Sequence, residues 1–130
     1  MNDVPWTFLQ TPEELRAWET AWRGPAGDPP LNLFLPVLLE NPDIAFLAAA
    51  QDGQIVAGAV ANRTGDVVGL SNVFAPVDEQ AGFWAGAIAA ILRTFPGLPL
   101  VGYERAAELA VAQALGFKAI GPLRVWLYPQ

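Results

Sequence analysis

The stretch that decides the fold is residues 45–75, AFLAAAQDGQIVAGAVANRTGDVVGLSNVFA. It holds three apolar runs, Ala45 to Ala50, Ile55 to Ala61 and Val67 to Ala75, separated by Asp52-Gly53 and by Asn62-Arg63-Thr64-Gly65. Short apolar runs divided by such turns are typical of strands joined by hairpins, so the stretch predicts an antiparallel meander. The middle run consists mostly of alanine, glycine and valine, which leaves room for a helix or a ligand to pack closely on one face.

A helix and a strand are predicted after the meander. After Pro76 the apolar residues recur every three or four positions as far as Phe95, and Pro96-Gly97 ends the pattern. This spacing predicts a helix that packs on the sheet. Leu98 to Tyr103 is a short apolar run, which predicts a buried strand.

The C-terminal third predicts a second helix and the last strands. Glu104 to Leu115 is rich in alanine and predicts a helix. Gly116, with Phe117 behind it, is typical of a left-handed helix cap and its hydrophobic contact. Phe117 to Tyr128 then predicts terminal strands, which are interrupted at Gly121-Pro122.

The N-terminal region predicts a strand and two helices. Val4 to Leu9 is the strand, and Thr11-Pro12-Glu13-Glu14 is a capping box with proline at the first helical position. Trp18 and Trp22 share one face of the helix that follows, and we expect them to anchor the core. The apolar segment Leu31 to Glu40 predicts a second short helix, broken or started around Pro36.

The composition indicates one domain over residues 1–130, with 53% hydrophobic and 15% charged residues. The chain contains no cysteine and no histidine. This excludes a cysteine nucleophile, a Ser-His-Asp triad, zinc sites built from Cys and His, and disulfides, and we expect no metal. Chemistry must then come from carboxylates, tyrosine, serine or the backbone.

The charge balance argues against polyanionic partners. Thirteen acidic residues against 7 basic ones give a net charge of -6, and the basic residues are spread singly along the sequence. Such a field repels nucleic acid and anionic membranes, so we expect neither as a partner. The sequence has no signal-peptide pattern at its start and no long uncharged stretch, and we expect a cytoplasmic protein.

The element order resembles that of the GNAT (GCN5-related N-acetyltransferase) superfamily. The segments Ala114-Leu115-Gly116-Phe117 and Gly121-Pro122-Leu123-Arg124-Val125-Trp126-Leu127 look like the C-terminal half of many bacterial members. The resemblance implies an α/β (α+β) domain, with a mixed, mostly antiparallel twisted sheet of six to seven strands and about four flanking helices. It also implies acyl-CoA-dependent N-acyl transfer with acetyl-CoA as cofactor.

The family's pyrophosphate loop follows the pattern Gln/Arg-x-x-Gly-x-Gly/Ala, which matches only in part. Laid on residues 79–84, the pattern keeps Gly82 but meets Glu79 and Trp84 at its two ends. We expect Asp78 and Glu79 to cap the following helix and to repel phosphate. We also expect the Trp84 indole to occupy space that the phosphates need.

The resemblance also implies site residues. The pantetheine and pyrophosphate contacts would come from Val73, Phe74, Ala75 and Gly82. Glu104 would act as the base, with Tyr103 beside it as the acid, although Glu104 equally suits the first turn of a helix for its dipole alone. The tyrosine that many members place four residues before the Gly-Phe pair is Ala112 here, and a frequent helix-start asparagine is Arg105.

Two functions from different classes therefore remain open. The first is an acetyltransferase acting on a small amine or a peptide N-terminus. The alternative is a non-catalytic binding or scaffolding protein that keeps the fold without acetyl-CoA, and that forms a homodimer through exposed aromatic residues or its terminal strands. The acidic loop and Ala112 favour the alternative.

Overall fold

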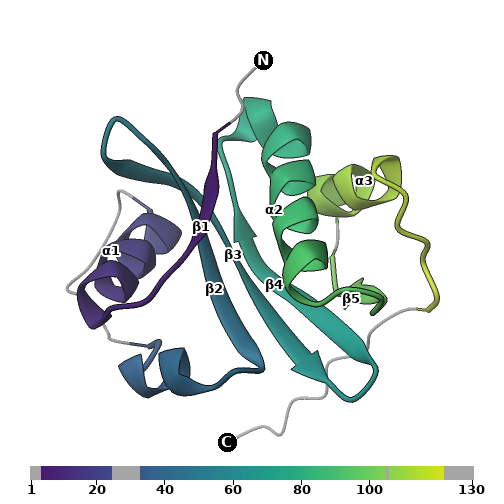
Figure 1. The fold of residues 1–130 in the computed structure, drawn as a ribbon. Coiled ribbons are helices and arrows are strands. Elements are labelled where there is room, and N and C mark those ends of the chain that lie inside the picture. The colour runs from purple at the N-terminus through teal and green to yellow at the C-terminus, as the bar shows by residue number, and fades with distance from the viewer. Residues whose placement is uncertain (1–3, 25–32, 105, 122–130) are drawn as a thin grey trace, which may run out of the picture.

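A computed structural model describes residues 4–24, 33–104 and 106–121 of the chain (Figure 1). A twisted sheet forms the centre, with α1 on one side and α2 and α3 on the other. The helices and strands, in chain order, are β1 (Trp6–Phe8), α1 (Pro12–Arg23), the 3-10 helix η1 (Pro36–Glu40), β2 (Ile44–Gln51), β3 (Gln54–Thr64), β4 (Val67–Phe74), the 3-10 helix η2 (Val77–Glu79), α2 (Gln80–Thr94), β5 (Leu100–Gly102) and α3 (Ala106–Ala114).

The sheet confirms the predicted meander. Its strand order is β1-β2-β3-β4-β5, with antiparallel pairing from β1 to β4 and parallel pairing between β4 and β5. The β2–β3 turn contains Asp52 at φ 52 and Gly53 at φ 79, the left-handed geometry that a tight two-residue hairpin requires. The mixed sheet and the helices on both faces agree with the predicted fold class.

The two faces of the sheet carry separate cores because successive strand residues point to opposite sides. Leu47, Ala59 and Ala61 belong to the core beneath α2, which also receives Ala112 from α3. Phe46 belongs to the core beneath α1. The alternation along β2 and β3 thus allows one sheet to support helices on both faces.

Helix α1 begins with the capping box that the sequence predicts. Thr11 Oγ1 accepts a hydrogen bond from the Glu14 amide at 3.1 Å, and the Glu14 carboxylate accepts one from the Thr11 amide at 3.1 Å. The hydrogen bond from the Gln10 amide, together with those from Thr11, lowers the pKa of Glu14. Trp18, fully buried on this helix, donates from Nε1 to the Leu47 carbonyl at 2.9 Å.

The C-terminal cap of α3 is also as predicted. Gly116 has φ 105, and the Phe117 amide donates to the Ala112 carbonyl at 3.0 Å. The Phe117 side chain packs against the core beneath α2. The hydrophobic contact that accompanies a left-handed cap is therefore present.

Three predictions about the elements need correction or limits. The helix predicted over Leu31 to Glu40, broken or started around Pro36, is the 3-10 helix η1 that begins at Pro36 among the described residues, because Leu35 before the proline is held in extended backbone, at ψ 138. The described residues contain five strands and three α-helices, fewer than predicted. Residues 117–121 form no strand, and the rest of the predicted terminal strands lie outside the described residues.

The helices in the described part of the chain are too short or too polar to cross a membrane.

Candidate active site

Strand β4 contains a bulge near its end. Val60 and Gly58, two residues apart on β3, pair with Ser71 and Phe74, which are three apart on β4. The extra residue is accommodated where Asn72 adopts φ 53, a left-handed conformation that asparagine tolerates better than most residues. A bulge of this kind changes which residues direct their peptide groups to each edge of the strand.

Before the bulge, Val68 directs its amide to the β5 side, where it donates to the Pro99 carbonyl at 3.0 Å. After the bulge, Val73 packs into the same core as Val68, so its peptide groups face the same edge of the strand as those of Val68, and so do those of Ala75 two residues further on. Pairing with β5 has already ended by then, because its last pair is Leu70 with Gly102. Val73 and Ala75 therefore lie along a stretch of β4 edge that β5 does not cover.

The side chains of this segment are anchored away from that edge. Val73 packs against the core beneath α2, and Phe74 packs against the core beneath α1. The Phe74 ring lies 5.4 Å from the Trp18 ring, at an interplanar angle of 71°. The cofactor contacts predicted for these residues would therefore have to come from their backbone, because their side chains are engaged in the two cores.

The first turn of α2 follows closely on β4. Gly82 is exposed, and a Cβ built on it would meet nothing within 4 Å. Glu79 is the N-cap residue but makes no side-chain capping hydrogen bond, so the capping predicted for it is wrong. Its backbone, at ψ 21, continues from η2 and lacks the extended conformation that a capping side chain needs.

The prediction for Trp84 is also wrong. Trp84 is 1% exposed and belongs to the core beneath α2, where Ala87 and Ile91 follow it at helical spacing. Its indole therefore points toward the sheet and leaves the solvent side of the first turn open. Its Nε1 donates to Gln80 Oε1 at 3.1 Å, and Gln80 Nε2 donates to the Ala75 carbonyl at 2.8 Å.

The two predicted proton-transfer residues follow directly on β5. Tyr103 is 76% exposed, and Glu104 is half-buried. Burial raises the pKa of Glu104, and the nearby Glu108 carboxylate on α3 raises it further. Because β4 and β5 run parallel and pair last at Leu70 and Gly102, these residues leave the sheet at the same end as the uncovered edge of β4.

Ala112, at the position of the family tyrosine, is 5% exposed and lies in the core beneath α2. A tyrosine there would meet packed side chains, and Tyr103 is the described tyrosine beside the candidate site. Arg105 lies outside the described residues. No group of acidic residues in the described ranges could hold a metal ion.

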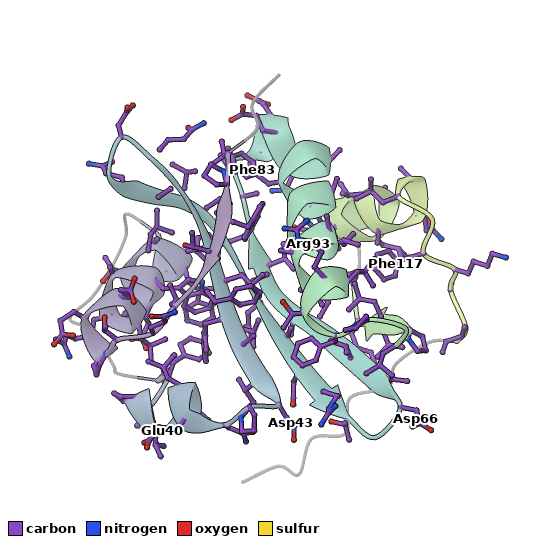
Figure 2. The ribbon with its side chains drawn as sticks, viewed as in Figure 1. Glu40, Asp43, Asp66, Phe83, Arg93 and Phe117 are labelled. Carbon is purple, nitrogen blue, oxygen red and sulfur yellow. The ribbon has the colours of Figure 1, made fainter. Side chains whose placement is uncertain are left out.

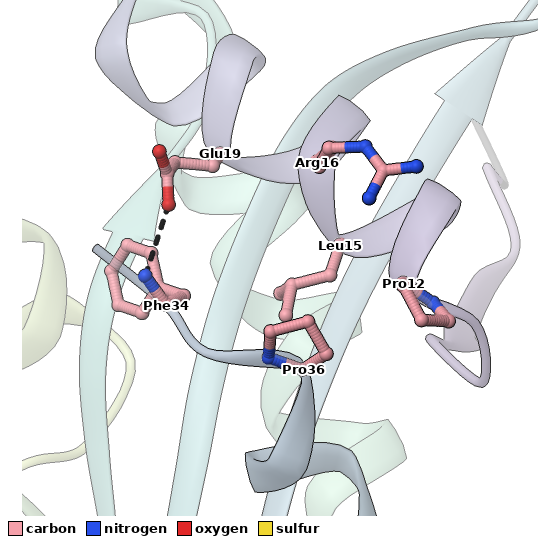
Figure 3. A pocket seen from close by; sticks show the side chains of 6 residues that line it. All are labelled: Pro12, Leu15, Arg16, Glu19, Phe34 and Pro36. Carbon is pink, nitrogen blue, oxygen red and sulfur yellow. Dashed lines mark hydrogen bonds between the residues drawn. The ribbon is translucent and has the colours of Figure 1, made fainter. Parts of the chain in front are cut away.

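A shallow pocket of about 330 Å³ lies elsewhere, between α1 and the segment before η1 (Figure 3). Glu19 on its wall is buried and accepts a hydrogen bond from the Phe34 amide at 3.0 Å. None of the predicted site residues contributes to the lining, which among the described residues consists of Pro12, Leu15, Arg16, Glu19, Phe34 and Pro36. The carboxylate therefore ties the two segments together, and the pocket is separate from the candidate active site.

Sequence reasoning missed the bulge at Asn72 and the role of Gln80. Nothing in the sequence marks an extra strand residue except an asparagine, which is common in many loops. The spacing of Gln80 and Trp84, four residues apart on a helix, was a usable signal, because such residues are neighbours on one face.

No protein-family model matches the chain, and no curated protein sequence matches it significantly. Solved structures do match. The aminoglycoside N-acetyltransferase AAC(6')-Iy, in complex with the bisubstrate analogue CoA-S-monomethyl-acetylneamine, aligns with a TM-score of 0.72 and 22% identity over 99% of each chain. An acyl-CoA N-acyltransferase from Pseudomonas aeruginosa gives a TM-score of 0.70 at 20% identity, covering 95% of this chain and 93% of that chain.

Escherichia coli ElaA also aligns with a TM-score of 0.70, at 14% identity, with 95% of this chain and 93% of that chain covered. At such identities the likeness concerns the fold. The chain has the fold of the GNAT superfamily, as the sequence predicted.

Proposed function

We propose that the chain is an N-acyltransferase that transfers the acetyl group of acetyl-CoA to a small amine or a peptide N-terminus. The observation that carries the proposal is the edge of β4 at Val73 and Ala75, which no other strand of the described residues covers and which leads into the first turn of α2 at Gly82. The solved structures with the same fold include one that contains CoA and one with a CoA bisubstrate analogue, which supports this choice of cofactor.

The residues present fit an acyl-CoA. The peptide groups of Val73 and the amide of Ala75 would pair with the amides of the pantetheine arm, as an added strand would, while the Ala75 carbonyl accepts from Gln80. Backbone amides in the first turn of α2 would receive the pyrophosphate, since a helix N-terminus offers free N–H groups and a partial positive charge. Gly82 leaves that approach open because no side chain projects from it. When bound, acetyl-CoA supplies a thioester carbonyl as the acyl donor.

Glu104 and Tyr103 would handle the protons. Transfer needs an unprotonated amine, so a base must take one proton from the acceptor as the new N–C bond forms. Burial and Glu108 raise the pKa of Glu104, which makes its carboxylate a stronger base than an ordinary surface glutamate. Tyr103, whose side chain is exposed, would return a proton to the departing sulfur.

The first test is cofactor binding. Thermal unfolding would be followed with about 1 mM acetyl-CoA, CoA or ADP, since a ligand at 100 times its Kd adds about 2.7 kcal/mol of stability. Both CoA forms should raise the Tm by several degrees, and ADP, which lacks the pantetheine, should raise it less. Equal Tm values with and without acetyl-CoA would count against the proposal.

The second test is turnover. Because the chain contains no cysteine, released CoA thiol can be titrated with a disulfide reagent without a protein background. Amines would be screened with the wild type and with Glu104→Gln, which should lower kcat/KM by about 100-fold or more if Glu104 is the base. A lack of both cofactor binding and turnover on any amine would leave the non-catalytic alternative, which the exposed carboxylates of Asp78 and Glu79 also favour.

A further inference from the structure

A polar relay connects the end of β4 to the first turns of α2. Gln80 is the first residue of α2, and its side chain donates from Nε2 to the Ala75 carbonyl at 2.8 Å. Its Oε1 accepts from Trp84 Nε1 at 3.1 Å. The relay thus bridges the segment from Pro76 to Glu79, which contains η2.

The Trp84 end of the relay is fixed by burial. A buried indole N–H without an acceptor is costly, and Trp84 is 1% exposed. The helix supplies that acceptor one turn back, as the side chain of Gln80. Because the indole is packed in the core beneath α2, it holds the Gln80 amide group in one orientation.

The Gln80 end of the relay requires an amide. One side chain must accept from Trp84 and donate to Ala75, and glutamine has both an oxygen and an NH₂ group at that reach. Glutamate lacks the donor when ionised, methionine lacks both groups, and asparagine is one methylene shorter. The sequence therefore places at position 80 the side chain that can join both partners.

We propose that Gln80 and Trp84 are positioning residues for cofactor binding. The inference rests on the proposed function. The relay fixes the uncovered edge of β4, at Ala75, relative to the backbone amides of the first turn of α2. These two parts would bind the pantetheine and the pyrophosphate of one molecule, so their separation must be set before the cofactor arrives. Trp84, which replaces the small residue of the family pattern, thereby supports the site from behind.

A positioning role of this kind predicts a selective kinetic effect. The hydrogen bonds of the Gln80 side chain go to Ala75 and Trp84, so its loss should raise KM for acetyl-CoA and leave kcat and the acceptor KM nearly unchanged. A residue that mattered only for folding would lower the amount of active protein and leave KM alone.

The test compares Gln80→Met with wild type and with Gln113→Met, which removes an exposed glutamine amide from α3. Trp84→Phe is the third variant and breaks only one of the two hydrogen bonds. Amide hydrogen exchange over residues 79–84 of the free protein should be about tenfold faster in Gln80→Met, less accelerated in Trp84→Phe and unchanged in Gln113→Met. The KM for acetyl-CoA should rise about tenfold in Gln80→Met, with kcat within about twofold.

The outcomes separate the relay from the function. If wild type binds no acetyl-CoA, the proposed function fails and the cofactor role fails with it, while the exchange data still show whether the relay holds the turn. If wild type binds acetyl-CoA but Gln80→Met matches it in exchange and in KM, the relay is overturned and the function stands.

Discussion

The two faces of the sheet are held in different ways. Beneath α1, five aromatic rings pack mostly edge to face, with centroids 5.0–6.3 Å apart, namely those of Trp18, Trp22, Phe34, Phe46 and Phe74. Beneath α2, the buried residues are Trp84 and Phe95 among alanines and aliphatic side chains, and Trp6, Phe8 and Phe117 pack against them partly buried. The aromatic side fixes the end of β4 through Phe74, and the other side leaves the first turn of α2 open around Gly82. The α1 side of the sheet therefore holds the end of β4 in place, and the α2 side leaves the first turn of α2 accessible.

The strongest way to break the aromatic side is Trp18→Ala. Trp18 is fully buried, contacts Phe34, Phe46 and Phe74, and donates its indole N–H to the Leu47 carbonyl. Its loss should cost about 3–5 kcal/mol of unfolding free energy, from the cavity and from the carbonyl left without this donor. Urea denaturation measures this loss of unfolding free energy. The milder control is Trp22→Ala, because Trp22 is only half-buried. Equal losses in the two variants would show that the cluster is not centred on Trp18.

The sequence predicted the aromatic side better than the open side. The capping box at Thr11 and the spacing of Trp18 fix α1 and its buried face through local rules that act within one helical turn. The orientation of Trp84 was misjudged because the loop pattern assigned it to the phosphate site, although its helical spacing to Ala87 and Ile91 indicated the core. The bulge at Asn72 depends on pairing between β3 and β4, and one sequence contains no record of that register.

Two glycine substitutions sharpen the comparison. A Cβ on Gly58 would overlap with the rings of Phe74 and Trp18, so Gly58→Ala should cost about 1–3 kcal/mol of stability.

A Cβ on Gly82 meets open space, so Gly82→Ala should leave stability unchanged or raise it by up to about 1 kcal/mol. The same change should weaken CoA binding about tenfold, which is about 1.4 kcal/mol, by obstructing the backbone amides. Unweakened CoA binding by Gly82→Ala would place the pyrophosphate elsewhere.

Replacing an acidic residue in the turn before α2 should change CoA binding less than Gly82→Ala does, and in the opposite direction. Asp78 is exposed in η2, beside the turn proposed to receive phosphate. Asp78→Asn should tighten CoA binding by roughly two- to fivefold at low salt, because it removes one exposed like charge. Asp66→Asn is the matched control, since Asp66 lies at the other end of β4, away from the start of α2 near Phe83 (Figure 2). Titration calorimetry at two salt concentrations measures the difference, and identical Kd values for both variants would contradict the placement.

The smallest expected effect concerns the pH dependence of turnover. Burial is the larger cause of the raised pKa of Glu104, and the Glu108 carboxylate is the smaller one. If Glu104 is the base, activity rises as pH passes its pKa, because only the carboxylate accepts a proton. Glu108→Gln removes the like charge and should move that rise to lower pH, with the plateau nearly unchanged, whereas Glu13→Gln on α1 should not.

The sign of the accompanying stability change follows from the same pKa. A carboxyl whose pKa is raised in the folded state favours folding while protonated, and loses that contribution as pH rises through the folded pKa. Stability of the wild type should therefore fall over this range relative to Glu104→Gln, and Glu108→Gln should reduce the fall by removing part of its cause. Chemical denaturation across the range measures it. A rate profile that moves in Glu108→Gln without this stability change would assign the acid limb to a group other than Glu104.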